Sequence, residues 1–171
     1  METQDAIRSR RNVRDYEDRS IPSEDLDAIL EAGRRTPSSS NQQRWDLVVV
    51  TDRGQLEELA KVWRGAGHVA RSAATIALVA PAAGDAGTRE SIHYDLGQLT
   101  MSIMIAAADR GIGSGHSAVR DHDLARELLG LPEDRVCAWL TALGYPAGRP
   151  LAPISEPDRR PFDDVVHRGR W

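Results

Sequence analysis

Apolar residues recur at helical spacing in several segments of the chain. Between residues 21 and 36 the apolar stripe consists of Leu26, Ile29 and Leu30. We expect Ser23 to cap this helix and Gly33 to end it. A second stripe, in residues 54–63, consists of Leu56, Leu59, Ala60 and Trp63. Residues 91–111 are apolar almost all round in their second half, which predicts a long helix of the core.

Continuous apolar runs predict strands at residues 45–51, 73–81 and 136–146. The second run is apolar throughout, so we expect it to be buried on both faces. Residues 112–119 follow the long helix as a strand and loop, and a capped helix is expected over residues 120–132. Because helices and strands are mixed without clean alternation, the pattern predicts an α+β fold with a mixed sheet flanked by helices.

The segment after the last strand has a different composition. Residues 148–171 contain four of the nine prolines and little periodic apolar pattern. Such a segment cannot form a packed core of its own, so it is either a disordered tail or an arm extended over another surface. We therefore divide the chain into a core, residues 1–148, and a C-terminal arm, residues 149–171.

Charge and composition exclude several classes of protein. The formal net charge is −4, whereas a general nucleic-acid binder needs a basic face. The first residues have no apolar stretch typical of a signal peptide, and no apolar run is long enough to cross a membrane. The single cysteine, Cys137, cannot form an internal disulfide and is expected to be a buried thiol. We expect a soluble cytoplasmic protein without a metal site, nucleic acid or membrane partner.

A cluster of arginines near the N-terminus contrasts with this acidic composition. Residues 7–22 contain Arg8, Arg10, Arg11 and Arg14. Guanidinium groups in this arrangement suit a phosphate, because they form bidentate, charge-assisted hydrogen bonds, and Arg10 and Arg14 can share one helix face. The alternative, which this stretch alone favours, is a solvated basic helix end paired with Asp15, Glu17 and Asp18.

Other polar stretches are candidates for binding. Residues 36–45, TPSSSNQQRW, offer neutral donors and acceptors beside an aromatic, which suits a heterocycle with imide and ribityl groups or an ordinary turn. Residues 109–117, DRGIGSGHS, follow a helix and open a strand, which is the reverse of a dinucleotide-binding loop. We expect these glycines to end the helix and to allow a close backbone approach. His116 is either a site residue or a structural histidine, and Asp121 is expected to cap a helix.

Taken in order, these motifs resemble the nitroreductase family of FMN-dependent oxidoreductases, in a short form. That family opens with a helix, an R-R-S-x-R-x-[FY] box, V/I-P, a second helix and P-S-x-x-N-x-Q-P-W before a strand. Residues 6–52 of this chain follow the same order. The resemblance continues more weakly through residues 65–79, the long helix and residues 111–117, and returns in residues 158–167.

The resemblance implies an FMN site at the interface of a homodimer. Arg10, Arg11 and Asn12 match the part of the box at the phosphate and ribityl group, and Arg14 matches the residue near flavin N1 and O2. Arg159 and Arg160 match basic tail residues that complete the phosphate clamp. The loop that meets FMN from the partner subunit is matched by Pro37, Ser38, Ser39, Asn41 and Gln43, and the backbone facing flavin N5 by Gly115 and His116.

The family also implies a mechanism, in which NAD(P)H delivers a hydride to flavin N5 and a small acceptor such as a nitroaromatic or quinone then replaces it. No residue is assigned as a catalytic acid or base. The implied fold is a nitroreductase-like sheet whose C-terminal arm is exchanged between protomers, with Phe162 and Trp171 as its anchors. Alternatives are a deazaflavin-linked oxidoreductase and a non-enzymatic protein that binds or sequesters flavin.

This chain departs from the family pattern at three places. Asn12 stands where serine is usual, and Arg44 stands where proline precedes the tryptophan. Between residues 81 and 91 the chain is short where longer members insert helices over the substrate face. We therefore expect a more open pocket, with less selection of substrates by enclosure.

Overall fold

The computed structural model describes residues 1–171, and its centre is a four-stranded antiparallel sheet with the strand order β1-β2-β4-β3. The strands, in chain order, are β1 Asp46–Val50, β2 Ala74–Pro81, β3 Gly113–Ala118 and β4 Arg135–Gly144. A short parallel bridge between Asn12 and Ser114 adds the N-terminal segment to the open edge of β3. The sheet therefore contains both antiparallel ladders and one parallel contact.

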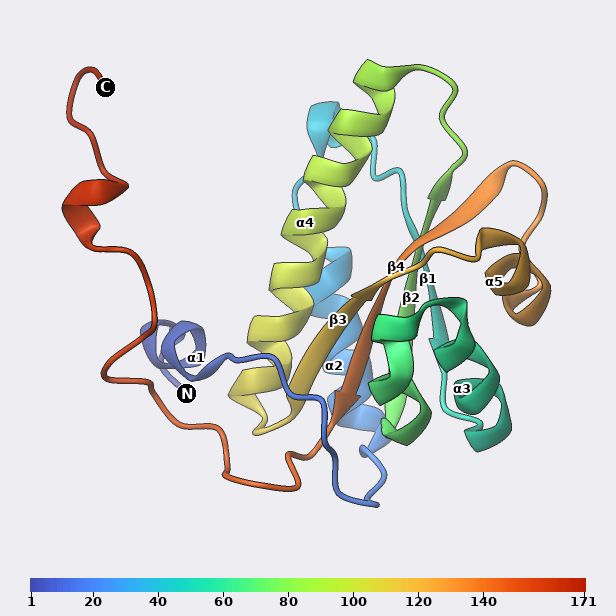
Figure 1. Ribbon diagram of the computed structural model, residues 1–171, viewed down its shortest axis with the longest axis horizontal. Helices are drawn as coiled ribbons and strands as arrows, with labels where there is room; N and C mark the ends of the chain where they lie inside the picture. The colour runs from blue at the N-terminus through green and yellow to red at the C-terminus, as the bar shows by residue number, and fades with distance from the viewer.

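Helices cover both faces of the sheet, which confirms the predicted α+β class (Figure 1). The α-helices are α1 Thr3–Ser9, α2 Ser23–Arg34, α3 Arg53–Leu59, α4 Ala86–Asp109 and α5 His122–Leu129. Short 3-10 segments are η1 Ser39–Asn41, η2 Ala60–Val62, η3 Arg64–Arg71 and η4 Phe162–Asp164. Helices α2 and α4 lie on one face, and α3, η2, η3 and α5 lie on the other. None of the helices has the length and apolar character needed to cross a membrane.

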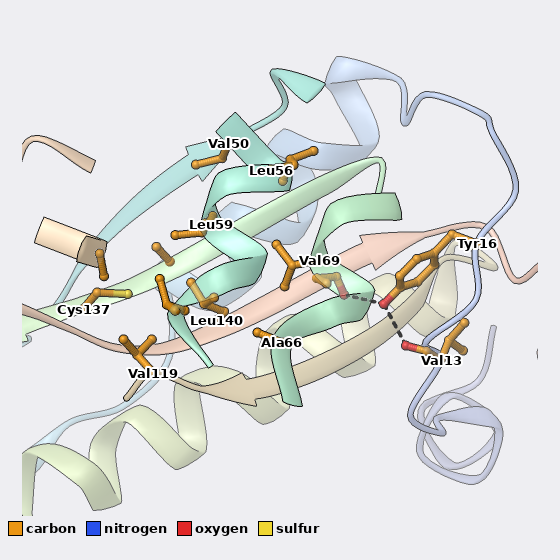
Figure 2. Close-up of a cluster of buried hydrophobic side chains, with 14 residues drawn as sticks. Val13, Tyr16, Val50, Leu56, Leu59, Ala66, Val69, Val119, Cys137 and Leu140 are labelled. Carbon is orange, nitrogen blue, oxygen red and sulfur yellow. Dashed lines mark hydrogen bonds between the residues drawn. The ribbon is translucent and has the colours of Figure 1, made fainter. Parts of the chain in front are cut away.

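Each face of the sheet has its own hydrophobic core. On the α4 side, Ile76 and Leu78 of β2 pack with Leu96, Leu99 and Ile103 of α4, all fully buried. On the other side, a cluster that includes Val50, Leu56, Leu59, Val69 and Leu140 joins the sheet to α3 and η3 (Figure 2). Strand β2 contributes to both cores, so its predicted burial on two faces is confirmed. Cys137 is a free, buried thiol, as predicted.

Capping fixes several helix ends. The carboxylate of Asp121 accepts a hydrogen bond from the Leu124 amide at 2.9 Å, which confirms its predicted role, and Gly130 ends α5 with φ 63°. Asp85 caps α4 in the same way, so this helix begins earlier than residue 91. Ser23 does not cap α2, because the Pro22 carbonyl already accepts the first helical hydrogen bonds and Ser23 lies inside the helix.

The helix predicted over residues 54–63 is shorter than expected. Helix α3 ends at Leu59 and continues as the 3-10 segment η2 to Val62. Trp63 is extended, with φ −166°, and its indole lies against Gly65, where any Cβ would overlap the ring. The chain turns at this point because Gly65 leaves room for the indole, so the apolar stripe does not extend to Trp63.

The C-terminal arm runs past α1 and then leaves the body of the protein (Figure 1). The Ile154 amide donates to the Arg8 carbonyl at 3.2 Å, and Leu151 packs against the edge of one core. From residue 155 onward every residue of the arm is exposed. Phe162 and Trp171 are 65% and 99% exposed. The last part of the arm therefore has apolar side chains that its own chain does not cover.

Candidate functional site

The arginine box lies on an extended segment that crosses the ends of β3 and β4. Helix α1 ends at Ser9, and Arg10 already has extended backbone angles. The prediction that Arg10 and Arg14 share a helix face is therefore wrong. Main-chain hydrogen bonds fix the segment, with the Val13 amide donating to the Ser114 carbonyl at 2.8 Å. The sheet edge, and not a helix, therefore sets the direction of each arginine.

Glycines let this segment lie directly on the sheet. A Cβ at Gly115 would collide with the Val13 carbonyl, and one at Gly144 would lie 2.7 Å from the Tyr16 ring. The Tyr16 hydroxyl donates to the Val13 carbonyl at 2.7 Å, and Tyr16 is only 2% exposed (Figure 2). The close approach predicted for Gly115 therefore brings the chain's own residues 13–16 against β3, and Gly144 allows a second one that was not predicted.

A cavity of about 480 Å³ opens beside this segment, between α4 and the strands β3 and β4. Helix α4 supplies much of its lining, including Leu96, Met101 and Met104, and Arg10, His116 and Trp139 come from three other segments. The Nε atom of Arg10 and the Nδ1 atom of His116 are both buried without a hydrogen-bond partner. A largely apolar cavity with two unpaired polar atoms suits a flat ligand that carries acceptor groups.

Trp139 reaches this cavity because β4 bulges where it faces β2. The register changes there, with Leu78 opposite Trp139 and Val79 opposite Cys137. A bulge of this kind redirects side chains, and Ala138 and Trp139 both pack on the α4 side. The Trp139 indole Nε1 donates to His93 Nδ1 at 3.4 Å, and its ring lies edge-on to His116 with centroids 6.5 Å apart.

The positive charges of Arg10 and Arg14 both act on His116. Burial lowers the pKa of His116, and the charges of Arg14 and Arg10 lower it further. Arg14 acts in the same direction on His68, whose pKa is lowered chiefly by burial. His68 Nε2 lies 3.2 Å from the Gly115 carbonyl, on the other face of β3 from the cavity. The edge of β3 therefore lies in a positive potential that favours an anionic ligand.

Arg11 points away from the cavity and toward the arm. Its Nη2 donates to the Arg149 carbonyl at 2.6 Å, and both residues line a pocket of about 270 Å³. Burial and then the Arg149 charge lower the pKa of Arg11. This pair joins a residue of the box to a basic residue of the arm. Arg149 was not found from the sequence, where its only signal was that it precedes a proline in the arm, as Arg160 does.

The polar loop lies on the opposite face of α4 from the cavity. The Ser39 amide and hydroxyl both donate to Asp95, which projects about 200° around the helix from the cavity residue His93. None of Pro37, Ser38, Ser39, Asn41 and Gln43 lines the cavity. Within one chain the structure therefore does not bring this loop to the arginine box.

The remaining sequence-predicted residues are exposed and do not line the cavity, and among them Arg14 lies on the segment that crosses the sheet. Asn12 is exposed at the β3 edge, where its backbone makes the parallel bridge to Ser114. Arg159 and Arg160 are exposed in the arm and bond only to arm carbonyls, those of Asp158 and Asp164. They do not meet the arginine box of the same chain.

The cavity and the arginines beside it can hold an anionic, planar ligand. No cluster of His, Cys, Asp and Glu side chains is arranged to hold a metal ion.

His68, His93 and Trp139 were not found from the sequence, because only the fold brings them near β3. A tryptophan with a polar tip inside an apolar strand was the one available signal for Trp139.

Comparison with known proteins agrees with this architecture. The family model described as "Nitroreductase family" matches residues 7–75 and 55–145. A protein of Archaeoglobus fulgidus, provisionally named NADH dehydrogenase/NAD(P)H nitroreductase, is 32% identical over 169 residues, which cover 96% of each chain. A provisionally named NADH oxidase from Clostridium acetobutylicum has a similar structure, with TM-score 0.86, 22% identity and coverage of 98% of this chain and 100% of that one.

A further solved structure is the NADPH:FMN oxidoreductase from Vibrio harveyi in complex with NAD+. Its TM-score is 0.85 at 25% identity, with coverage of 97% of this chain and 76% of that one. The family match spans most of the chain, and the Archaeoglobus protein has the same extent. The chain therefore belongs to the nitroreductase family of oxidoreductases.

Proposed function

We propose that this protein is an FMN-dependent NAD(P)H oxidoreductase that works as a homodimer and reduces a small acceptor such as a nitroaromatic or a quinone. The observation that supports this most directly is the cavity beside β3. It combines an apolar lining with unpaired buried atoms of Arg10 and His116. The Vibrio relative, an NADPH:FMN oxidoreductase by name, supports the same cofactor and reductant.

The residues of the site fit FMN in their chemistry. For the phosphate and ribityl end, Arg10 provides a guanidinium group at the cavity, and Arg11 provides a second one outside it, beside Arg149. Asn12 lies next to them at the β3 edge, where an amide can replace the usual serine hydroxyl as donor. Residues 13–16 and His68 cover Gly115, so within β3 the main-chain groups for a planar ring are those at His116.

When bound, FMN supplies the acceptance of a hydride at N5 and its transfer to a second substrate. The role of Arg14 is to stabilise the negative charge that collects at the pyrimidine side of the ring on reduction. After burial, which is the main cause, the Arg14 charge also contributes to the lowered pKa values of His116 and His68. Burial and the charges of Arg14 and Arg10 lower the pKa of His116, which favours its neutral form.

Several predicted site residues lie away from the cavity of their own chain, and a second copy of the chain would explain their positions. The loop residues Pro37, Ser38, Ser39, Asn41 and Gln43 lie behind α4, and Arg159 and Arg160 lie on the exposed part of the arm. We infer that these segments meet the cavity of the partner subunit. The exposed Phe162 and Trp171 fit an arm that packs on the partner.

Access to the site follows from the short link between β2 and α4. Residues 82–85 alone connect these two elements, so no inserted helix covers the cavity. We infer a broad choice of acceptors, because the chain selects them less by enclosure than longer relatives do.

The proposal is tested with Arg14→Ala. Loss of the guanidinium is expected to weaken FMN binding and to lower the flavin potential, because reduced flavin loses its nearby positive charge. FMN affinity is measured by quenching of flavin fluorescence, and the potential by reductive titration with a reference dye. Arg64→Ala, an exposed arginine on the other face of the sheet, is the matched control. Unchanged affinity and potential in Arg14→Ala would refute the role of this residue.

A further inference from the structure

We infer that Asp95 is a positioning residue, which holds the polar loop of residues 37–43 in a fixed shape for use by the partner subunit. Asp95 lies in α4 and is 1% exposed. Its oxygens accept hydrogen bonds from the Ser39 amide at 3.0 and 3.2 Å and from the Ser39 hydroxyl at 3.1 Å. The inference rests on the proposed function, because it concerns a loop assigned to FMN.

Hydrogen bonds from this loop allow the Asp95 carboxylate to be buried. A carboxylate away from water is stable only where hydrogen bonds or charges compensate it. Asp95 forms no ion pair, and all its side-chain hydrogen bonds come from Ser39. A buried charge that is satisfied by a single residue fixes that residue strongly, because a shift of the loop would leave the carboxylate unpaired.

The loop itself has a backbone that is not stable without support. Ser40, Asn41 and Gln43 have φ values of 51°, 53° and 49°, a left-handed conformation that non-glycine residues rarely adopt. Hydrogen bonds within the loop hold it together, with the Gln43 amide donating to Ser38 Oγ at 2.9 Å. Strained backbone of this kind persists where surrounding contacts impose it, and it is common at ligand sites.

Arg44 provides a second attachment one helical turn away. Its Nη2 donates to Ser91 Oγ at 2.7 Å, and Ser91 precedes Asp95 by four residues on α4. The residue that replaces the proline usual in the family thus ties the end of the loop to the same face of the helix. Asp95 and Ser91 together fix both ends of the strained segment.

This attachment holds the loop on a face of α4 that is remote from the cavity of the same chain. Asp95 and Ser91 lie on one face of α4, and the cavity residues Gly97 and Met101 lie on another. The side chains of Ser40, Asn41 and Gln43 are exposed and form no contact with the arginine box. The loop is therefore held ready for a ligand bound by a second copy of the chain.

The test compares FMN binding by wild-type protein, Asp95→Ala and Asp95→Asn. Asp95→Ala releases the loop, which must then be ordered again on binding, and we expect affinity to fall about 10- to 100-fold. Asp95→Asn keeps an oxygen for the Ser39 amide and loses the charge, so its loss is expected to be smaller, about 3- to 10-fold. Glu90→Ala, which removes an exposed carboxylate from the same helix, is the control.

A mixed dimer separates positioning from general instability. One chain carries Asp95→Ala and the other carries Arg10→Ala. Because the loop serves the partner's site, one site of this dimer contains an intact loop and an intact Arg10, and the other site lacks both. We expect half of the sites to bind FMN with wild-type affinity, whereas both homodimeric variants bind weakly.

The outcomes distinguish this inference from the proposed function. Failure of the wild-type protein to bind FMN would overturn the proposed function and with it this inference. Wild-type binding that is unchanged in Asp95→Ala and Asp95→Asn would overturn the inference alone. Weak binding at both sites of the mixed dimer would also overturn it, because the loop would then act only within its own chain.

Discussion

Gly115→Ala tests how the arginine box is held on the sheet. Position 115 lies on β3, beneath the segment that carries Arg10 and Arg14. An alanine Cβ there would collide with the Val13 carbonyl and would lie 3.1 Å from the Tyr16 hydroxyl. Since the first of these is a backbone atom, the overlap cannot be relieved by a change of rotamer. The segment of residues 12–17 must move away from β3.

The expected loss in the free energy of unfolding follows from the contacts that this movement breaks. Overpacking in a tight site costs about 1–3 kcal/mol. Two hydrogen bonds are weakened, from the Val13 amide to Ser114 and from the Tyr16 hydroxyl to Val13, at about 1 kcal/mol each. Restriction of the unfolded chain by alanine offsets about 0.5 kcal/mol. We expect a net loss of about 2–4 kcal/mol, which for a chain of this size lowers Tm by about 5–15 °C.

The assay is urea and thermal unfolding followed by tryptophan fluorescence, with FMN binding measured on the same samples. Gly67→Ala is the control, because a Cβ at Gly67 meets no atom within 4 Å. Binding of FMN is expected to fall in Gly115→Ala and to stay unchanged in Gly67→Ala. Equal stability of the two variants would refute the argument that Gly115 is required for close approach of the box.

Three further predictions concern buried groups. Burial lowers the pKa of His68, so the folded state binds fewer protons than the unfolded state below about pH 6.5. The free energy of unfolding is therefore expected to fall between about pH 7 and pH 5, and His68→Gln should reduce this slope in urea titrations at several pH values. Burial raises the pKa of Cys137 to about 12, so the thiol should react with Ellman's reagent only after unfolding; rapid labelling of native protein would contradict this. Tyr16→Phe removes the donor to the buried Val13 carbonyl and should cost about 1–2 kcal/mol in chemical denaturation, and a variant as stable as wild type would show that this bond is dispensable.

Local sequence signals determine much of the fold. The apolar run at residues 73–81 is a central strand, because only two buried faces accommodate such a sequence. Asp121 and Gly130 bound α5 through hydrogen bonds that residues close in sequence can make by themselves. Signals of this kind fail where a residue outside the pattern decides the end of an element. Helix α3 stops early because of the chain turn at Gly65, which its own apolar stripe does not encode.

The candidate site is harder to predict from the sequence than the fold is. Arg10 and Arg11 are neighbours, yet one lines the cavity and the other contacts Arg149, because the extended backbone sends adjacent side chains in opposite directions. The bulge at β4 redirects Trp139, and a change of register is not visible in a single strand. Similarly, Asp95 is one of many acidic residues in the sequence, and only its burial beneath Ser39 distinguishes it.

The proposed function depends most directly on binding of FMN, and an absorbance spectrum of the protein after gel filtration with added FMN tests it. We expect bands of oxidised flavin in a fraction of dimer size and their bleaching by NADH or NADPH. Flavin that stays bound without bleaching would favour a deazaflavin-linked enzyme or a flavin-binding protein. A colourless protein that retains no FMN would contradict the account, because the arginine box would then not be a phosphate clamp.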